Sequence, residues 1–431
     1  MPNRLSRRRF LQTTALGAAG LSTALSFAGD KKPPANERLA VGVIGVAGQG
    51  EHDWTEIHKA GAEIVALCDV DESRTKTARE TFPDAPFYTD FRRLIDQKGL
   101  DAVLVATPDH THAPATLAAL RAGLHVFCEK PLTHTVYEAR LVAETAAKHK
   151  RVTQMGTQIH GGDNYRRVVE LIQAGAIGTV REVHVWVKTS YGGGVDRPKE
   201  KQKVPPGLHW DLWLGPAPQR PYNSAYVPFW WRGWWDFGGG ALADMACHHM
   251  DLPFWALKLR HPTKITAEGP PPHPESTSKG LIVHYEFAAR GELPPVKLTW
   301  YDGGKRPALF AQGKLPKWGD GSLFVGSKGM LLAGYGERKL LPEKEFADFK
   351  PPTPFIPNSI GHYKEWVEAC KTGGPTTCNF DYAGALTEAV LLGNVSYHLG
   401  KPIEWDAKKF KANEPGAEKF LRPVYRKPWT L

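Results

Sequence analysis

The chain has 431 residues, of which 42% are hydrophobic and 23% are charged, and its formal net charge is +10. This length usually exceeds one hydrophobic core, so we expect two domains, and the composition is that of an ordinary soluble globular protein. About half of the net positive charge lies in the first 32 residues, and no basic cluster interleaved with aromatics follows, so we expect no nucleic-acid partner.

The first 30 residues indicate a twin-arginine export signal. Ser6 to Leu11 (SRRRFL) precede a weakly apolar stretch from Thr13 to Phe27 and a small-residue site at 26–28. An amphipathic N-terminal helix is the alternative. The stretch is too short and too rich in small residues for a transmembrane helix, so we expect no stable membrane anchoring. This pathway exports folded proteins to the periplasm, which fits five scattered cysteines without a disulfide pattern. Residues 31–38 form the expected linker.

Residues 39–158 have the pattern of a doubly wound dinucleotide-binding (Rossmann) domain. The apolar run 39–44 predicts a buried strand, and the glycine-rich turn after it can place a pyrophosphate at the N-terminus of the next helix. The candidate cofactor-binding residues of this turn are Gly45, Ala47, Gly48, Gln49 and Gly50. Ala47 replaces the middle glycine of the GxGxxG pattern, so the match is imperfect.

Asp69 follows the second predicted strand, 63–68, and lies 19 residues beyond Gly50. A carboxylate at this place can accept hydrogen bonds from the adenosine ribose and repels a 2′-phosphate. NAD is therefore favoured over NADP, although Arg74 keeps NADP from being excluded.

The strand predicted at 102–106 leads into a polar loop before a helix at 113–122. The loop supplies three candidate cofactor contacts: Thr107, Pro108 and His110. His110 and His112 alternate like metal ligands, but no cysteine or carboxylate stands at ligand spacing. We therefore expect no metal and interpret both histidines as loop and helix-cap residues.

The next apolar run, 126–128, ends in Glu129, Lys130 and Pro131. Ligands bind beyond the carboxyl ends of parallel strands, so this pair is placed for chemistry. Lys130 offers a cation to an oxygen that gains negative charge, Glu129 offers an acceptor for cofactor hydroxyls, and Pro131 keeps both out of the following helix. Apolar spacing then predicts a helix around 136–146 and a last strand at 152–155.

From 159 to 405 we expect an α+β domain with a large, mainly antiparallel open sheet. Asp163 is placed to cap a helix that runs through Ile172, and alternating residues predict strands at 183–188, 281–287, 296–301 and 323–332. Helices would cover one face, and the other face would be free to form a homodimer or homotetramer. Residues 406–431 form the expected C-terminal tail.

Residues 209–235 hold six tryptophans among prolines. Aromatics at this density either stack on sugar faces and build a groove wall or clamp a loop onto the domain core, and the pattern leaves both alternatives open. Trp230 and Trp235 are the candidates for substrate contact.

The helix predicted within 236–251 carries Asp244, His248 and Asp251 at spacing i, i+4, i+7, on one face, with His249 rotated away. A carboxylate one turn before a histidine can fix its tautomer and support its charged form, as a general base requires. The alternative is a core histidine bonded to a helix acid. His249 is a further candidate for substrate contact.

Taken in order and spacing, these motifs resemble the Gfo/Idh/MocA oxidoreductases over about residues 39–405, in an exported, tryptophan-rich form. The resemblance implies hydride transfer between a sugar or sugar-derivative carbinol and a nicotinamide. It assigns Lys130 to the reacting oxygen, His248 to its proton and Asp244 to the orientation of His248. It also implies that Glu129 contacts the nicotinamide ribose and that the Lys130–Pro131 peptide bond is cis.

Free dinucleotide is scarce outside the cytoplasm, so we expect NAD to be tightly bound and recycled within the site. This leaves a second enzyme class open, an NAD-dependent glycoside hydrolase or lyase that acts through a transient 3-keto sugar with no net redox change. A sugar-binding protein with a vestigial site is a third alternative, which unchanged activity of a Lys130→Ala variant would support.

Overall fold

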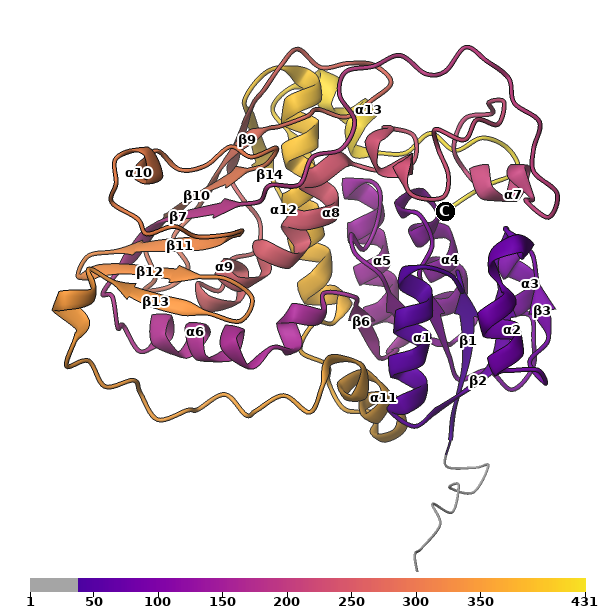
Figure 1. Cartoon of the computed structure of the whole chain (residues 1–431), viewed down its shortest axis with the longest axis horizontal. Coiled ribbons are helices and arrows are strands. Elements are labelled where there is room, and N and C mark those ends of the chain that lie inside the picture. Colours follow the sequence, from indigo (N-terminus) through magenta and orange to yellow (C-terminus); the bar gives the residue numbers. More distant parts are fainter. Residues whose placement is uncertain (1–37) are drawn as a thin grey trace, which may run out of the picture. The chain divides into compact units, whose positions relative to one another are not determined.

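Two β-sheets organise residues 38–431, which are the residues that the computed structural model describes. The first sheet belongs to the N-terminal half of this part and the second to the C-terminal half (Figure 1). The predicted export signal at 1–30, and all but the last residue of the predicted linker, lie outside the described residues.

The first sheet has the strand order β3-β2-β1-β4-β5-β6, and all of its neighbouring strands are parallel. Its strands are β1 (Leu39–Ile44), β2 (Ala62–Cys68), β3 (Phe87–Tyr88), β4 (Ala102–Val105), β5 (His125–Cys128) and β6 (Thr153–Met155). The helices between them are α1 (Gln49–Lys59), α2 (Lys76–Thr81), α3 (Phe91–Ile95), α4 (Asp109–Arg121) and α5 (Val136–His149). The strands are almost entirely apolar and buried, as parallel strands covered on both faces require. The predicted Rossmann domain is confirmed.

The order of the first sheet reverses between β1 and β4, where successive crossovers leave in opposite directions. Such a switch point opens a crevice at the carboxyl ends of the strands. The glycine turn and the loop after β4 both lie there, so the topology places the candidate cofactor residues together.

The second sheet has nine strands in the order β13-β12-β11-β7-β10-β9-β8-β14-β15. Only β7 and β10 pair in parallel within it, so the predicted mainly antiparallel sheet is confirmed. Its strands are β7 (Val180–Trp186), β8 (Lys264–Glu268), β9 (Ile282–Phe287), β10 (Val296–Tyr301), β11 (Gly321–Gly326), β12 (Gly329–Ala333), β13 (Arg338–Leu341), β14 (Ile403–Asp406) and β15 (Lys411–Ala412). The single strand expected at 323–332 is wrong, because the chain reverses at Ser327 and Lys328 and makes the β11–β12 hairpin.

One face of the second sheet packs against helices through Val183, Val283 and Leu298, all fully buried. The helices of this half are α6 (Asp163–Gln173), α7 (Trp210–Leu214), α8 (Gly240–His249), α9 (Asp251–Ala256), α10 (Ala308–Ala311), α11 (His362–Thr372), α12 (Phe380–Leu399) and α13 (Glu418–Leu421). The opposite face is not wholly free, because Phe310 of α10 packs edge-on against Trp186 of β7.

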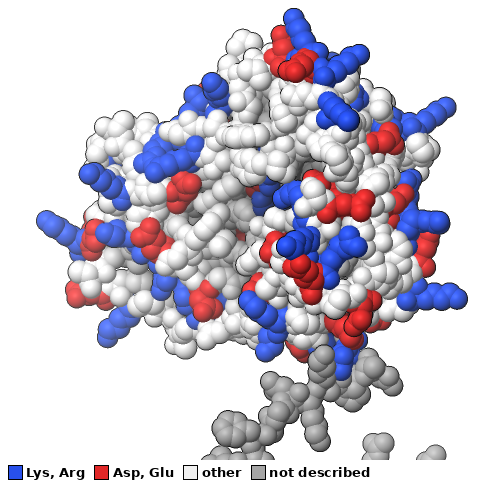
Figure 2. All heavy atoms as spheres, turned by 45° about the vertical axis from the view of Figure 1, so that its right-hand side comes forward, with Lys and Arg blue, Asp and Glu red and all other residues white. Residues whose placement is uncertain are grey.

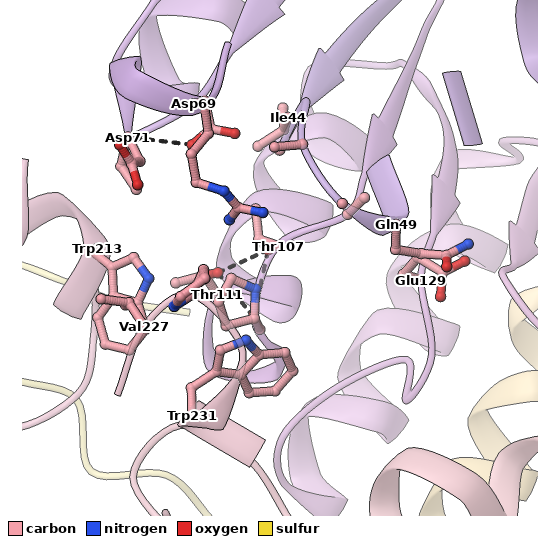
Figure 3. Close-up of a pocket in the computed structure, with 18 of the residues that line it drawn as sticks. Ile44, Gln49, Asp69, Asp71, Thr107, Thr111, Glu129, Trp213, Val227 and Trp231 are labelled. Carbon is pink, nitrogen blue, oxygen red and sulfur yellow. Dashed lines mark hydrogen bonds between the residues drawn. The ribbon is translucent and has the colours of Figure 1, made fainter. Parts of the chain in front are cut away.

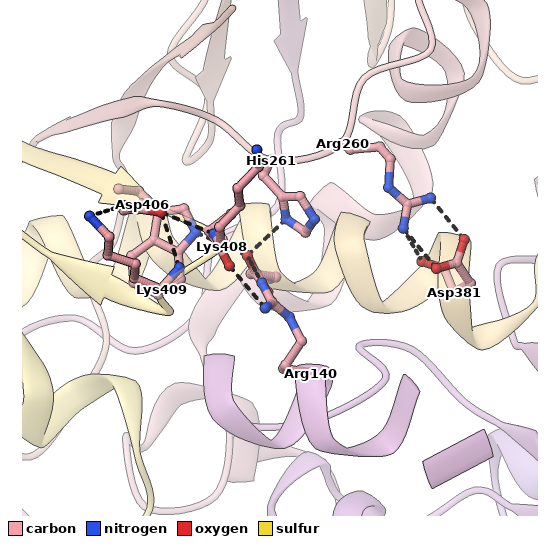
Figure 4. Close-up of polar contacts among 10 residues, drawn as sticks. Arg140, Arg260, His261, Asp381, Asp406, Lys408 and Lys409 are labelled. Carbon is pink, nitrogen blue, oxygen red and sulfur yellow. Dashed lines mark hydrogen bonds and ion pairs between the residues drawn. The ribbon is translucent and has the colours of Figure 1, made fainter. Parts of the chain in front are cut away.

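Helix α12 is the central support of the second half and lies between the two sheets (Figure 1). The Asn379 side chain caps its first turn, and Gly400 ends it in the left-handed conformation. Arg140 of α5, labelled in Figure 4, donates hydrogen bonds at 2.7 to 3.1 Å to the carboxylate of Glu388 on α12. The same carboxylate accepts a hydrogen bond from Trp405 of β14. This buried charge cluster ties the Rossmann half to the second half.

Several predicted boundaries shift by a few residues. Gly162, and not Asp163, occupies the N-cap position of α6, and α4 begins at Asp109, four residues before the predicted start. The expected tail at 406–431 contains β15 and α13.

None of the helices within residues 38–431 is long and apolar enough to cross a membrane. Acidic and basic side chains are interspersed over the face shown in Figure 2.

Candidate active site

A cavity of about 370 Å³ opens at the carboxyl ends of the Rossmann strands (Figure 3). Residues at the ends of β1, β2, β4 and β5 contribute to its wall. The predicted cofactor and substrate residues among its lining are Gly45, Ala47, Gly48, Gln49, Asp69, Thr107, Pro108, Glu129 and Lys130. Nine residues singled out from the sequence therefore meet in one place.

The glycine turn leaves the start of α1 open. Gly48 is the N-cap of α1 with a φ of 65°, and no side chain caps the helix. The free amides of the first turn can therefore receive a pyrophosphate. Gly50 does not line the cavity, which corrects its predicted contact with the cofactor: a Cβ there would lie 2.0 Å from the Gly45 carbonyl oxygen, so Gly50 lets the turn close.

Asp69 stands at the end of β2, across the cavity from Glu129 (Figure 3). Its carboxylate accepts the backbone N–H groups of Val46 and Asp71, both at 3.0 Å, which fixes its orientation. Burial raises the pKa of Asp69 while these hydrogen bonds oppose the rise. Each carboxylate oxygen keeps a further lone pair that can accept a ribose hydroxyl. The Arg74 side chain lines the same wall.

Lys130 lines the cavity at the end of β5 and forms an ion pair with Asp244 of α8. Its Nζ lies 2.6 Å from Asp244 Oδ1, with the two side chains 13% and 7% exposed. Tyr191 donates its hydroxyl to Asp244 Oδ2 at 2.8 Å, and Arg232 Nε lies 3.3 Å from Oδ1. Although burial acts to raise it, the charges of Lys130 and Arg232 bring the pKa of Asp244 well below 3.8. Asp244 is therefore an anion that holds two cations in place.

The hydrogen bonds of Asp244 correct the role predicted for it, which was to orient His248. No hydrogen bond joins the two side chains in the part of the chain that the structure describes, and His248 Nδ1 is buried without a partner. Burial, and then the charge of Lys130, lowers the pKa of His248 well below 6.5. His248 is thus a neutral imidazole one turn beyond Asp244.

The peptide bond between Lys130 and Pro131 is cis, as the resemblance implied. His112, from the first turn of α4, lies against this bend, with Nδ1 2.8 Å from the Pro131 carbonyl oxygen and Nε2 2.7 Å from that of Thr107. His112 therefore braces the ends of β4 and β5 against each other, which is a structural role.

Two further carboxyl groups near Lys130 are buried acids. Burial, and then the negative charge of Asp244, raises the pKa of Asp109 from 3.8 to about 8. Burial, and then the charge of Asp53, raises the pKa of Glu129 well above its usual value. Gln158 donates to Glu129 Oε1 at 3.0 Å and so fixes its position. Burial therefore acts against ionisation of Asp109 and Glu129, whereas the neighbouring cations keep the pKa of Asp244 low.

Two segments of the second half, 207–213 and 227–232, cover the cavity, and we call them the roof. The long connection after β7 carries them across to the Rossmann half, where α7 lies (Figure 1). The N–H of His209 donates to the Val70 carbonyl at 2.8 Å, and the N–H of Glu72 donates to the Gly207 carbonyl at 2.9 Å. Arg426, close to the C-terminus, donates to the Gly215 carbonyl just beyond the first segment at 2.7 Å. Two main-chain bonds and the Arg426 side chain therefore fasten the roof over the dinucleotide side of the cavity.

His110, which was expected in the site, and Asp251, which was predicted on the same helix face as Asp244, both have other roles. His110 does not line the cavity, because its ring is buried against Trp213 and its Nε2 donates to the Trp213 carbonyl at 2.9 Å. Asp251 begins α9 beyond the end of α8 and lies 2.8 Å from His160 Nδ1, in a buried pair that Tyr382 also contacts. Both are core residues, although His110 Nδ1 is buried without a hydrogen-bond partner among residues 38–431.

The three residues predicted to touch substrate also lie apart from the cavity lining. Trp235 donates its indole N–H to the His273 carbonyl at 2.9 Å. His249 stacks on Tyr335 with ring centroids 4.6 Å apart. Trp230 is 59% exposed at the outside of the roof. Most aromatics of 209–235 are buried in one cluster, so packing is their main role.

Two site residues escaped prediction, Arg232 and Tyr191. Arg232 is the one charged residue between Trp230 and Trp235, and an arginine inside an aromatic run was a usable signal. Tyr191 precedes three glycines in an irregular loop, and no pattern in the sequence marked it.

Family models match both halves of the chain. Residues 39–157 match a model described as oxidoreductase family, NAD-binding Rossmann fold, and residues 164–293 match one described as oxidoreductase family, C-terminal alpha/beta domain. Together the two matches cover more than half of the chain. Both carry the name of the Gfo/Idh/MocA oxidoreductases.

Among curated proteins, an inositol 2-dehydrogenase from Saccharopolyspora erythraea is 34% identical over 152 residues, 35% of this chain and 45% of that protein. A glycosyl hydrolase family 109 protein from Shewanella pealeana is 31% identical over 201 residues, 41% of this chain and 44% of that protein. The chain thus spans less than half the length of the curated relatives it matches.

Solved structures share the fold at lower identity. A levoglucosan dehydrogenase in complex with NADH and levoglucosan has a TM-score of 0.58 at 17% identity, covering 85% of this chain and 99% of that one. An aldose-aldose oxidoreductase from Caulobacter crescentus has a TM-score of 0.56 at 17% identity, covering 85% of this chain and 100% of that one.

Proposed function

Because the chain belongs to the Gfo/Idh/MocA family of oxidoreductases, we propose that it is an NAD-dependent enzyme that moves a hydride between a sugar or sugar-derivative carbinol and the nicotinamide. One observation carries this proposal. A single cavity runs from the glycine turn and Asp69 to Lys130 and its buried ion pair with Asp244. The groups that can bind a dinucleotide and the cation that suits a reacting oxygen therefore line the same cavity.

The nicotinamide supplies the hydride acceptor. Lys130 binds the substrate oxygen and stabilises the negative charge that it gains. Asp244 and its two other partners hold the Lys130 ammonium in place. His248, a neutral imidazole one turn beyond Asp244 that does not itself line the cavity, is proposed to take the hydroxyl proton. Glu129, fixed by Gln158, is the group on the cofactor side of Lys130 and binds the nicotinamide ribose.

We propose NAD, tightly held, as the cofactor. Asp69 presents a carboxylate where a 2′-phosphate would otherwise sit, which favours NAD over NADP. The roof supports this proposal, because the main-chain bonds of Gly207 and His209 to the loop after β2 hold it over the dinucleotide side of the cavity.

The test is purification of residues 38–431 without added nucleotide, denaturation, and identification of released NAD or NADP by mass. The holoenzyme is then mixed with sugars, and absorbance at 340 nm reports reduction of the bound cofactor. Lys130→Met should keep the cofactor content and lose reduction. A chain that contains no dinucleotide and binds none when it is added would overturn the proposal.

The similarity to a glycosyl hydrolase family 109 protein, together with the roofed cavity, favours a second function. In a redox-neutral glycoside hydrolase or lyase, the sugar would pass a hydride transiently to bound NAD and regain it later, with Lys130 again at the reacting oxygen. Release of nitrophenol from nitrophenyl glycosides, with no lasting change at 340 nm, identifies this class. Lasting reduction equal to the cofactor content identifies a net dehydrogenase.

Residues 1–30 are proposed to export the folded protein to the periplasm by the twin-arginine pathway. Replacing Arg7 and Arg8 by Lys should keep the protein in the cytoplasm.

We also propose a homodimer or homotetramer formed through the part of the second sheet that α10 leaves uncovered, and light scattering on the purified chain tests it. A monomer at all concentrations would overturn that proposal.

A further inference from the structure

We propose that the substrate sugar carries a carboxylate and that Arg232 binds it, which makes Arg232 a specificity-determining residue. This inference rests on the proposed function, because Arg232 lines the same cavity as Lys130.

Two aromatic rings hold the guanidinium of Arg232, which lines the cavity. It lies in the 3-10 turn Trp230–Gly233, with its guanidinium carbon 4.2 Å from the Trp231 ring centroid and 4.7 Å from that of Phe229. These contacts fix the plane of the guanidinium and leave its side chain 19% exposed. A planar fork that is already positioned loses little entropy when it binds a carboxylate in bidentate fashion.

The donors of Arg232 are only partly used. Nε faces Asp244 at 3.3 Å, and Nη1 donates to the Phe229 carbonyl oxygen at 3.4 Å. Nη2 donates to no other group among residues 38–431. Arg232 thus reaches the cavity with part of its hydrogen-bonding capacity available.

The charges around Lys130 do not balance. Lys130 and Arg232 contribute two positive charges, whereas Asp244 contributes one negative charge. Asp109 and Glu129 form no ion pair with either cation among residues 38–431, and burial raises the pKa of both carboxyl groups. An unmatched charge in a desolvated site is costly, and a ligand with one negative charge removes that cost. A carboxylate fits better than a phosphate monoester, which carries about −1.5 to −2 at neutral pH.

Matched sugar pairs test the proposal on the holoenzyme. D-glucuronate is compared with D-glucose, and D-galacturonate with D-galactose, by the rate of cofactor reduction per unit of sugar concentration. We expect the uronates to be preferred at least about tenfold and Arg232→Met to reduce that preference by about 10- to 100-fold, the range for a hydrogen bond to a charged group. Arg232→Lys should fall between the two, since it keeps the charge and loses the fork. Arg306→Met is the matched control, because Arg306 also lies over an aromatic ring, Phe310, and does not line the cavity.

The outcomes separate this inference from the proposed function. Equal rates with both sugars of a pair, or an equal loss on both in Arg232→Met, would overturn the inference and leave the oxidoreductase intact. A preference for glucose 6-phosphate over glucuronate would overturn the carboxylate assignment. If no sugar reduces the cofactor, the proposed function fails, and calorimetry then decides the inference: glucuronate binding that Arg232→Met abolishes supports it, and no glucuronate binding contradicts it.

Discussion

The buried ion pair between Lys130 and Asp244 allows a quantitative prediction. Asp244→Asn keeps the size of the side chain and removes its charge, so that Lys130 and Arg232 lose their counter-ion. Removing one partner of a buried ion pair costs about 3–5 kcal/mol. We expect about 3 kcal/mol of lost unfolding free energy at pH 7, the lower end of that range, because the amide oxygen of asparagine still accepts a hydrogen bond.

The pH dependence of this loss follows from the lowered pKa of Asp244. The carboxylate stabilises the fold above its unfolded-state pKa of 3.8, and this contribution is lost as the pH falls through the lower folded-state pKa. The difference between wild type and Asp244→Asn should therefore be complete at pH 7 and shrink below about pH 4. Urea unfolding at pH 7 and at lower pH measures both values.

Cofactor reduction gives the second readout for the same variant. A reacting group displaced by about 1 Å can lose about 100-fold in rate, so Asp244→Asn should reduce the bound cofactor at least that much more slowly. Glu388→Gln is the matched control, since it removes a buried carboxylate that is 1% exposed and paired with Arg140, outside the cavity. It should lose stability and keep the rate per folded molecule. An Asp244→Asn protein that reduces its cofactor at the wild-type rate, or a Glu388→Gln protein with an equal loss, would refute the reasoning.

Three further predictions follow from single side chains. Asp69→Ser should weaken NAD binding about 10- to 100-fold, because hydrogen bonds to a charged group are lost. It should also shift the preference towards NADP, because Arg74 lines the same wall, and calorimetry with both cofactors measures both effects. Burial, and then the charge of Lys130, lowers the pKa of His248, so it should remain a deprotonated proton acceptor as the pH falls through 6.5; a fall in the reduction rate centred near 6.5 would contradict the lowered pKa. Trp213→Ala should cost about 3–5 kcal/mol of unfolding free energy, since Trp213 is 7% exposed, whereas Trp230→Ala should change it by less than about 0.5; equal losses in urea unfolding would contradict the packing assignment.

The Rossmann half was predictable because its signals are local. A buried parallel strand is a continuous apolar run, and the residue after it is at the ligand edge whatever the rest of the chain does. Asp69 and Lys130 were therefore placed correctly by spacing alone. His110 was not, because the aromatic surface that covers its ring comes from Trp213, 103 residues later.

The second half was predictable only where alternation is regular. The strands at 282–287 and 296–301 alternate and were found, but β8, β13, β14 and β15 escaped prediction. Three of these four have at most four residues, which is too few to establish a period of two. Helix α12 is apolar on all sides and buried, so it lacks the amphipathic pattern that identifies a surface helix.

The pairing of Asp244 shows why helix spacing alone misassigns a charged residue. A side-chain pair at i, i+4 on a helix contributes only about 0.2–0.5 kcal/mol, and less when one member is neutral. Burial keeps His248 neutral, so it offers Asp244 no charge. Lys130 and Arg232 each offer Asp244 a full positive charge inside the same desolvated site, where charge-assisted hydrogen bonds are about twice as strong as neutral ones. Asp244 therefore bonds to Lys130 and Arg232, which are 114 and 12 positions away in the sequence, and not to His248 on its own helix. His248 is left free to accept a proton.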